Sequence, residues 1–328
     1  LPPTIPHLAQ AAAQRFGAAA AILEAGETWS YQQLWDKVRQ AASALLRAGI
    51  THGDRIAIWA PNRKEWIVAA IASQLAGAAV VPLNTRLKGS ETGDILRRTS
   101  AKMLFMVDAF LGTDYPALIK NEDLPALKRI IHFESDWTDF LAEGDLSDHE
   151  VDAALAQCSA DDVSDIMFTS GTTGIPKGVL TTHGRILPMF ENWTKLVDLR
   201  RDDPYLIINP FFHSFGFKAG WVAAMIVGAK IIPMAIFDVQ KAIDHIEHDR
   251  VAFIPGPPTI FQALLAELSG RKFDSSSLRS AMTGAATVPP SLIHRMYDEL
   301  GFERVLTAYG MTECTNTTSC MPGDPSEL

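Results

Sequence analysis

Short apolar, β-branched runs alternate with helical patterns along most of the chain. In the first half, the runs that read as strands cover residues 55–59, 79–82, 103–107 and 129–133. Helical patterns at 65–75 and 91–98 lie between them. Runs without an alternating polar face are typical of parallel strands that have helices on both faces of their sheet. The pattern therefore predicts βα repeats around a buried parallel sheet.

The beginning of the chain has a different pattern. A pair of strands is expected at residues 20–23 and 28–29. Ser30, followed three residues later by Gln33, forms a capping box, which predicts a helix that begins there and ends at Gly49.

A second βα series follows in the other half. Its expected strands cover residues 205–209, 230–233, 251–254, 278–282 and 304–308, and its helices cover 218–226, 239–248, 259–268 and 289–300. Residues 134–164, which are more acidic, are expected to be helical or looped. The repeated order of elements predicts an α/β fold of two doubly wound, mainly parallel βα subdomains, at residues 1–200 and 201–328.

A glycine-rich stretch at residues 169–178, TSGTTGIPKG, follows the apolar strand expected at 164–168. It contains three glycines, four hydroxyl side chains and one lysine, Lys177, and is badly suited to a core. Glycines allow the backbone to approach a ligand closely, and hydroxyls, free backbone N–H groups and a cation all bind oxyanions. The stretch has the chemistry of a phosphate-binding loop.

Composition limits the class of protein. The chain has 328 residues, 47% hydrophobic and 20% charged, which is ordinary for a soluble protein of about two domains. No apolar run approaches about 20 residues, so neither a signal peptide nor stable membrane insertion is expected. Cys158, Cys314 and Cys320 are too few and too irregularly spaced for a disulfide framework or a zinc cluster, which favours the cytoplasm.

The net charge of −9 is spread along the chain without a long basic cluster, which argues against a nucleic-acid partner. An anionic ligand therefore needs local cations or a metal ion.

The loop at 169–178 differs from the commoner phosphate motifs. A Walker loop needs G-x-x-x-x-G-K-[ST], but Gly178 follows Lys177, and no G-x-G-x-x-G fingerprint is present. The stretch instead closely resembles [ST]-S-G-T-T-G-x-P-K-G, the signature of the adenylate-forming superfamily of acyl- and aryl-CoA synthetases, luciferases and peptide-synthetase adenylation domains. The resemblance covers essentially the whole chain, but only the N-terminal part of the family's usual length.

Three further stretches are similar to family motifs, in the family's order. Residues 309–313, YGMTE, resemble Y-G-x-T-E, and residues 283–286, TGAA, resemble the adenine-contacting segment. Residues 210–213, PFFH, resemble the aromatic-histidine segment beside the acyl pocket. All three stand where expected strands end, which is where ligands of doubly wound sheets bind.

The resemblance implies a nucleotide site. The phosphate donors would be Thr169, Ser170, Gly171, Thr172, Thr173 and Gly174, with Lys177 on the β- and γ-phosphates. The adenine would lie between Tyr309 and the segment Gly284, Ala285 and Ala286, next to Gly310 and Met311. Glu313 would bind Mg²⁺ and Thr312 a phosphate oxygen, since hard oxygen donors suit this ion.

The resemblance also implies an acyl pocket formed by Phe212, His213, Phe215, Trp221 and Gly284. With Phe211 and Phe217 nearby, this wall favours a hydrophobic medium-chain or cyclic acid over acetate. His213 would border the carboxylate end of the pocket, and would act in catalysis with Lys177, Thr312 and Glu313. Cys314 has no indicated partner histidine, so a structural role is expected for it. The narrower similarity is to bacterial ligases of fatty-acid and steroid-ring-derived propionate degradation.

The implied function is ATP-dependent activation of a carboxylic acid to an acyl-adenylate and its transfer to coenzyme A. The family's later barrel part, its C-terminal domain, the ribose-binding Asp of a T-G-D motif and the C-terminal Lys are expected beyond Leu328, so this chain alone is expected to be inactive. A homodimer remains open. The alternatives are a fatty-acyl-AMP ligase that loads a carrier protein, luciferase-like oxidation of the adenylate, and a non-catalytic nucleotide-binding module.

Overall fold

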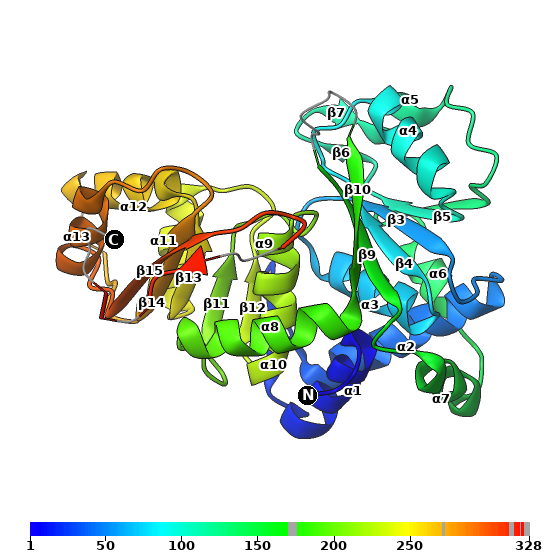
Figure 1. Cartoon of the computed structure of the whole chain (residues 1–328), viewed down its shortest axis with the longest axis horizontal. Coiled ribbons are helices and arrows are strands. Elements are labelled where there is room, and N and C mark those ends of the chain that lie inside the picture. Colours follow the sequence, from blue (N-terminus) through cyan, green and yellow to red (C-terminus); the bar gives the residue numbers. More distant parts are fainter. Residues whose placement is uncertain (170–175, 271–272, 315–317, 322, 325–328) are drawn as a thin grey trace. The chain divides into compact units, whose positions relative to one another are not determined.

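The computed structural model describes residues 1–169, 176–270, 273–314, 318–321 and 323–324 (Figure 1). Packing divides the chain into two units. The first contains Leu1–Ala18, Ser30–Pro188 and Phe211–His213, and the second contains Ala19–Trp29, Met189–Pro210 and Ser214–Leu328. The subdomain boundary at residue 200 stays a prediction. That prediction did not place residues 19–29 with the second subdomain, whereas in the structure they pack with the second unit.

The first unit contains a six-stranded sheet in the order β10-β9-β4-β3-β5-β8. Its strands are β3 (Arg55–Trp59), β4 (Ala79–Pro82), β5 (Met103–Met106), β8 (Arg129–His132), β9 (Val163–Thr169) and β10 (Lys177–Thr182). All neighbouring pairs are parallel except β9 and β10, which form an antiparallel hairpin at the edge. The predicted buried parallel sheet is confirmed, and most of its strands agree with the sequence to within one residue.

Helices cover this sheet, and a two-stranded hairpin lies beside it. The helices are α1 (Ile5–Phe16), α2 (Tyr31–Arg47), α3 (Lys64–Leu75), α4 (Gly89–Thr99), α5 (Tyr115–Ile119), α6 (Trp137–Ala142) and α7 (Asp148–Gln157), and the hairpin is β6 (Ala109–Phe110) with β7 (Thr113–Asp114). The capping box predicted at Ser30 and Gln33 is present at the start of α2. The acidic region contains α6, α7 and loops, as expected.

The second unit contains an eight-stranded sheet in the order β16-β15-β14-β13-β11-β12-β1-β2. Its strands are β1 (Ala20–Glu24), β2 (Glu27–Ser30), β11 (Pro204–Ile207), β12 (Lys230–Pro233), β13 (Phe253–Gly256), β14 (Ser280–Gly284), β15 (Arg304–Tyr309) and β16 (Thr318–Ser319). Each neighbouring pair in the run from β15 to β1 is parallel, and β16 is antiparallel to β15. The expected α/β class, with two mainly parallel sheets, is confirmed.

Helices cover both faces of the second sheet. They are α8 (His183–Leu196), which contains the unit boundary, α9 (Ser214–Gly216), the π-helix η1 (Phe217–Val222), α10 (Ala223–Val227), α11 (Val239–His248), α12 (Pro258–Gly270) and α13 (Pro290–Asp298). Apolar side chains of α11, α12 and α13 form one buried cluster with the sheet. On the other face, Trp193 of α8 packs against Phe253, with ring centroids 5.6 Å apart.

The helix expected at 218–226 is present, but its first half is irregular. Residues 217–222 form a π-helix in which Gly220 has non-helical dihedral angles, φ −82° and ψ −107°. The side chain of Ile207 lies 3.3 Å from where a Cβ of Gly220 would stand. The Tyr205 hydroxyl donates to the carbonyl of Ala219 at 2.8 Å. Contacts from β11 therefore support this irregular turn, and π-turns are frequent at functional sites.

Candidate active site

The predicted phosphate loop joins the two strands of the β9–β10 hairpin. Thr169, the last residue of β9, pairs with Lys177, the first residue of β10. Lys177 is exposed. The other predicted donors, Ser170, Gly171, Thr172, Thr173 and Gly174, lie outside the described residues. The hairpin thus brings Thr169 and Lys177 together, and their roles at phosphates stay predictions.

Arg98 is a second cation at this hairpin, which the sequence did not indicate. It lies in the last turn of α4, and its Nη1 donates to the carbonyl oxygen of Pro176 at 2.7 Å. Its guanidinium carbon lies 5.0 Å from the centroid of the Phe168 ring. Arg98 therefore holds residues on both sides of the predicted phosphate loop. No motif contains it, and the contact joins positions 78 residues apart.

The adenine and metal motifs lie where strands of the second sheet end. The strands β11, β13, β14 and β15 are parallel neighbours, so their carboxyl ends lie on the same side of the sheet. Gly284, the last residue of β14, pairs with Ala308, which places it beside Tyr309 at the end of β15. The structure therefore brings together the two segments for which the sequence predicts adenine contacts.

The backbone at these strand ends is unusual. A Cβ on Gly284 would lie 2.3 Å from the carbonyl oxygen of Ala308, so no other residue fits without displacing β15. Ala285 has φ +62°, a left-handed conformation that costs an L-residue roughly 1–2 kcal/mol. Strained residues cluster at ligand-binding and active sites, although six other non-glycine residues in the described part of the chain also have positive φ. Tyr309 is 59% exposed, so its ring is accessible to a planar ligand.

The predicted metal residue stands in the turn that follows β15. The Cys314 amide donates to the Met311 carbonyl at 3.1 Å and closes a turn around Thr312 and Glu313. Glu313 is exposed, and Thr312 is half-buried. Within the described part of the chain, no cluster of three or more His, Cys, Asp or Glu side chains could hold a metal ion. One accessible carboxylate beside a hydroxyl fits an Mg²⁺ ion that takes its other ligands from phosphates and water.

The aromatic-histidine segment follows β11. Phe211 is fully buried, Phe212 is half-buried and His213 is exposed. Phe215 is half-buried, whereas Trp221 is fully buried and stacks on Phe217 with ring centroids 4.6 Å apart. Of the predicted pocket residues, His213, Phe212 and Phe215 are thus accessible to a ligand, whereas Trp221 is a packed core aromatic in the second unit.

Two buried hydroxyls lie directly next to predicted site residues. The Oγ of Ser214, directly after His213, and the Oγ1 of Thr283, directly before Gly284, have no hydrogen-bond partner within the described residues. Ser214 is 3% exposed and Thr283 is fully buried. Buried polar groups in native proteins are almost always satisfied, so a bound water or ligand atom is expected at each.

His183 and Cys314 are not among the predicted catalytic residues. The Nδ1 of His183, the first residue of α8, accepts a hydrogen bond from the amide of Ile5 at 3.3 Å. Burial lowers the pKa of His183 to about 4, so its ring is neutral near pH 7 and fixes the start of α1. Cys314 is an exposed free thiol.

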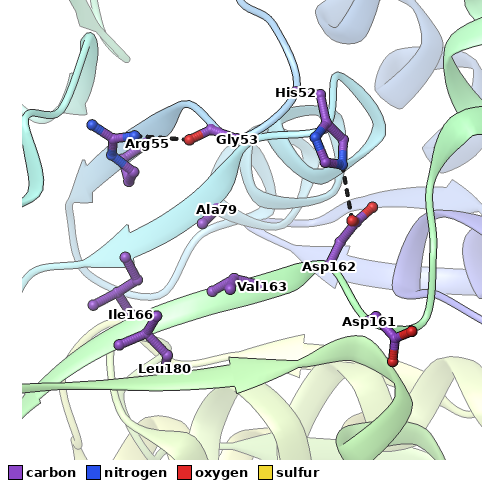
Figure 2. Close-up of a pocket in the computed structure, with 10 residues that line it drawn as sticks. His52, Gly53, Arg55, Ala79, Asp161, Asp162, Val163, Ile166 and Leu180 are labelled. Atoms are coloured by element: carbon purple, nitrogen blue, oxygen red, sulfur yellow. Dashed lines mark hydrogen bonds and ion pairs between the residues drawn. The ribbon is translucent and has the colours of Figure 1, made fainter.

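A pocket of about 360 Å³ in the first unit is lined by none of the predicted site residues (Figure 2). It lies at the amino ends of β3, β4 and β9, and its lining consists of His52, Gly53, Arg55, Gly77, Ala79, Asp161, Asp162, Val163, Ile166 and Leu180. His52 Nε2 lies 2.8 Å from an oxygen of Asp162, and Arg55 donates to the Gly53 carbonyl. The predicted motifs follow the carboxyl ends of strands, whereas this pocket lies at amino ends.

Comparison with known proteins gives a family match over residues 9–328, to the AMP-binding enzyme family. A ligase from Rhodococcus jostii (strain RHA1), named 3-[(3aS,4S,7aS)-7a-methyl-1,5-dioxo-octahydro-1H-inden-4-yl]propanoyl:CoA ligase, is 43% identical and is matched over 98% of this chain and 65% of its own length. A ligase of the same name from Mycobacterium tuberculosis is 46% identical, over 93% of this chain and 61% of its own length. The chain thus spans less than two thirds of these relatives.

Solved structures show the same fold. An inhibitor-bound N-terminal domain of FACL13 from Mycobacterium tuberculosis has a TM-score of 0.84 and 27% identity, over 94% of this chain and 76% of that one. An anthranilate CoA ligase in complex with anthranoyl-AMP has a TM-score of 0.88 over 98% of this chain, at 22% identity, and supports the fold alone. Among the helices that the structure describes, none is both long and apolar enough to cross a bilayer.

Proposed function

This chain belongs to the AMP-binding enzyme family, and on that premise we propose that the whole protein is an ATP-dependent acid:CoA ligase. It activates a hydrophobic carboxylic acid as an acyl-adenylate and transfers the acyl group to coenzyme A. The observation that carries this proposal is the pair of relatives, 43% and 46% identical, that are both named as propanoyl:CoA ligases of a bicyclic ring acid.

The proposed substrate class is a propanoic acid that carries a hydrophobic ring system. One observation on this chain supports it. The half-buried rings of Phe212 and Phe215 flank His213, which supplies apolar surface next to a polar group. Pockets of this composition bind ligands with a large apolar body and one polar end. A medium-chain acid shares this chemistry, whereas acetate does not fill such a surface.

The chemistry requires two substitutions. A carboxylate oxygen of the acid attacks the α-phosphorus of ATP, the bond from that phosphorus to the bridging oxygen breaks, and pyrophosphate leaves. The CoA thiolate then attacks the acyl carbon, and AMP leaves with the oxygen of the acyl–phosphate bond. Both reactants of the first step are anions, so catalysis consists mainly of positioning and charge neutralisation.

We assign these tasks to the residues that the hairpin and the strand ends present. Lys177 neutralises charge on the departing pyrophosphate, and Thr169 donates to a phosphate oxygen. Tyr309 and the segment Gly284–Ala285–Ala286 hold the adenine. His213 orients the substrate carboxylate. Thr312 binds a phosphate oxygen and Glu313 an Mg²⁺ ion, which, when bound, offsets phosphate charge.

The 328-residue chain alone is proposed to bind nucleotide weakly and not to turn over. It spans 65% and 61% of the two ligases. The family's ribose-binding Asp and the Lys that promotes adenylation are not among the motifs found in residues 1–328. Thioester formation by the purified chain at the rate of the whole protein would contradict this part of the proposal.

Acid-dependent exchange of labelled pyrophosphate into ATP, measured on the whole protein, tests the proposal. The panel contains the bicyclic dioxo propanoic acid of the relatives' names, a medium-chain fatty acid and acetate. We expect exchange with the first two and not with acetate. AMP release is then measured with free CoA and, separately, with a pantetheinylated carrier protein.

The outcomes separate the alternatives. Thiol-dependent AMP release with carrier protein but not with CoA would assign the protein to the carrier-loading ligases. Nucleotide binding without exchange for any acid would leave a binding module. Release of ADP and free phosphate would exclude adenylate formation altogether.

A further inference from the structure

Asn62 makes a buried contact with the aromatic-histidine segment. It lies between β3 and α3, and its side chain is almost fully buried, at 3% exposure. Its Oδ1 accepts a hydrogen bond from the backbone amide of Phe211 at 2.7 Å, across 149 positions of sequence. Trp66, four residues after Asn62, packs its ring edge-on against the Phe211 ring, with centroids 5.6 Å apart. One corner of the first unit thus holds both the backbone and the side chain of Phe211.

Phe211 belongs to a stretch of three residues that is grouped with the first unit. Phe211–His213 pack with the first unit, whereas Pro210 and Ser214 on either side pack with the second. Within the second unit, Asn209 donates from Nδ2 to the carbonyl of Pro255 at 3.0 Å. Asn209 and Asn62 therefore each make a buried hydrogen bond within their own unit.

The loop from Asn209 to Gly216 is tightly packed where its two ends meet. A Cβ on Gly216 would lie 2.2 Å from the carbonyl oxygen of Asn209 and 2.3 Å from that of Pro210. Positions 209, 210 and 216 are therefore in tight backbone contact. The loop that contains Phe211 and His213 therefore begins and ends at one tightly packed point.

We propose that Asn62 is a positioning residue for acid binding, which acts through Phe211 to fix His213. His213 is two residues after Phe211 and is the first exposed side chain that follows it. The inference rests on the proposed function, because it assigns to His213 the carboxylate of the substrate. Asn62 itself is buried and does not touch the acid.

The matched comparison is between Asn62→Leu and Ser43→Ala in the whole protein. Leu has the branched shape of Asn62 with a larger volume and removes the acceptor, whereas Asn62→Asp keeps an acceptor oxygen. Ser43 is also 3% exposed, and its Oγ accepts from the amide of Leu146 at 2.9 Å, across 103 positions. It therefore controls for loss of a buried side-chain acceptor of a distant loop amide, and its partner Leu146 is not a predicted site residue.

Pyrophosphate exchange is measured with acid and ATP varied separately. Asn62→Leu is expected to raise the KM for the acid roughly tenfold, since sub-ångström to 1 Å misplacement of a binding group has effects of this size or larger. The KM for ATP should change by less than about twofold. Asn62→Asp should recover most of the acid affinity. Ser43→Ala should lower the Tm without changing either KM. Equal changes of both KM values in Asn62→Leu, or an acid KM change in Ser43→Ala, would overturn the inference.

A second measurement does not depend on activity. The ring signals of ¹³C/¹⁵N-labelled histidine are recorded by NMR, and the His213 signal is assigned with His213→Gln. We expect Asn62→Leu, and Asn62→Ala if the Leu variant does not fold, to shift the His213 signal, while Ser43→Ala leaves it in place. An unshifted His213 signal refutes the positioning role. A shifted signal in a protein without acid-dependent exchange would refute the proposed function instead.

Discussion

Lys177 and Thr169 are partners across the antiparallel β9–β10 hairpin, so the strands enter and leave the glycine-rich stretch at directly opposed positions. Opposed residues of antiparallel strands lie about 5 Å apart. An exposed lysine is therefore held beside a hydroxyl at the base of the predicted phosphate loop.

Replacement of Lys177 by Ala should slow acid-dependent pyrophosphate exchange by roughly 10- to 100-fold, because one charge that faces the leaving group is lost. The Tm should stay within about 1–2 °C, because surface substitutions rarely change stability by more than about 0.5 kcal/mol. Lys195→Ala is the control, since the Lys195 side chain is 67% exposed on α8. Exchange at the wild-type rate in the Lys177 variant would remove this residue from the mechanism.

Arg98→Ala should raise the KM for ATP by roughly three- to tenfold. Its hydrogen bond to Pro176 and its stacking on Phe168 hold both sides of the loop, and a hydrogen bond from a charged group contributes about 1.5–3 kcal/mol when intact. Arg97→Ala is a matched control, because the neighbouring side chain has similar exposure and binds Glu122 instead. Kinetics with varied ATP measure the difference, and equal effects of the two variants would contradict a role for Arg98.

Gly284→Ala should weaken nucleotide binding and lower stability by about 1–3 kcal/mol, because the added methyl group would overlap the Ala308 carbonyl. Ala285→Gly is the comparison within the same segment, since glycine adopts the left-handed φ of this position without steric cost. Calorimetric titration with ATP and chemical denaturation give the two quantities. Wild-type affinity in Gly284→Ala would show that this segment does not hold the adenine.

Acid should destabilise the fold through His183. Its folded pKa of about 4 lies below the ordinary histidine value of 6.5, because burial disfavours the charged ring. The unfolded chain therefore binds a proton first as the pH falls below about 6.5, and stability is lost until the folded ring is also protonated near pH 4. The full loss is about 3 kcal/mol. Urea denaturation between pH 7 and pH 4 measures it, and His183→Gln should have a shallower pH dependence than the wild type by this amount.

Much of the fold is local and was accessible from the sequence. Strands 55–59 and 79–82 are β-branched runs that are buried on both faces, and their bounds agree with β3 and β4. The capping box at Ser30 is read from two side chains three residues apart. Strand bounds were less accurate at 251–254 and 278–282, which start two residues later as β13 and β14. Apolar runs indicate which residues are buried, but the register with neighbours decides where a ladder begins.

The chain by itself determined the loop chemistry of 169–178 and the three downstream motifs, because these depend on residue type and spacing within a few positions. Only the tertiary structure decided which distant residues support them. Arg98 on Pro176 and Asn62 on Phe211 join residues 78 and 149 positions apart. The place of β1 beside β12, and the pairing of Gly284 with Ala308, follow from packing of whole sheets. Such contacts have no local sequence signature. From the sequence alone, an arginine in a helix or an asparagine in a loop can equally well be exposed to solvent.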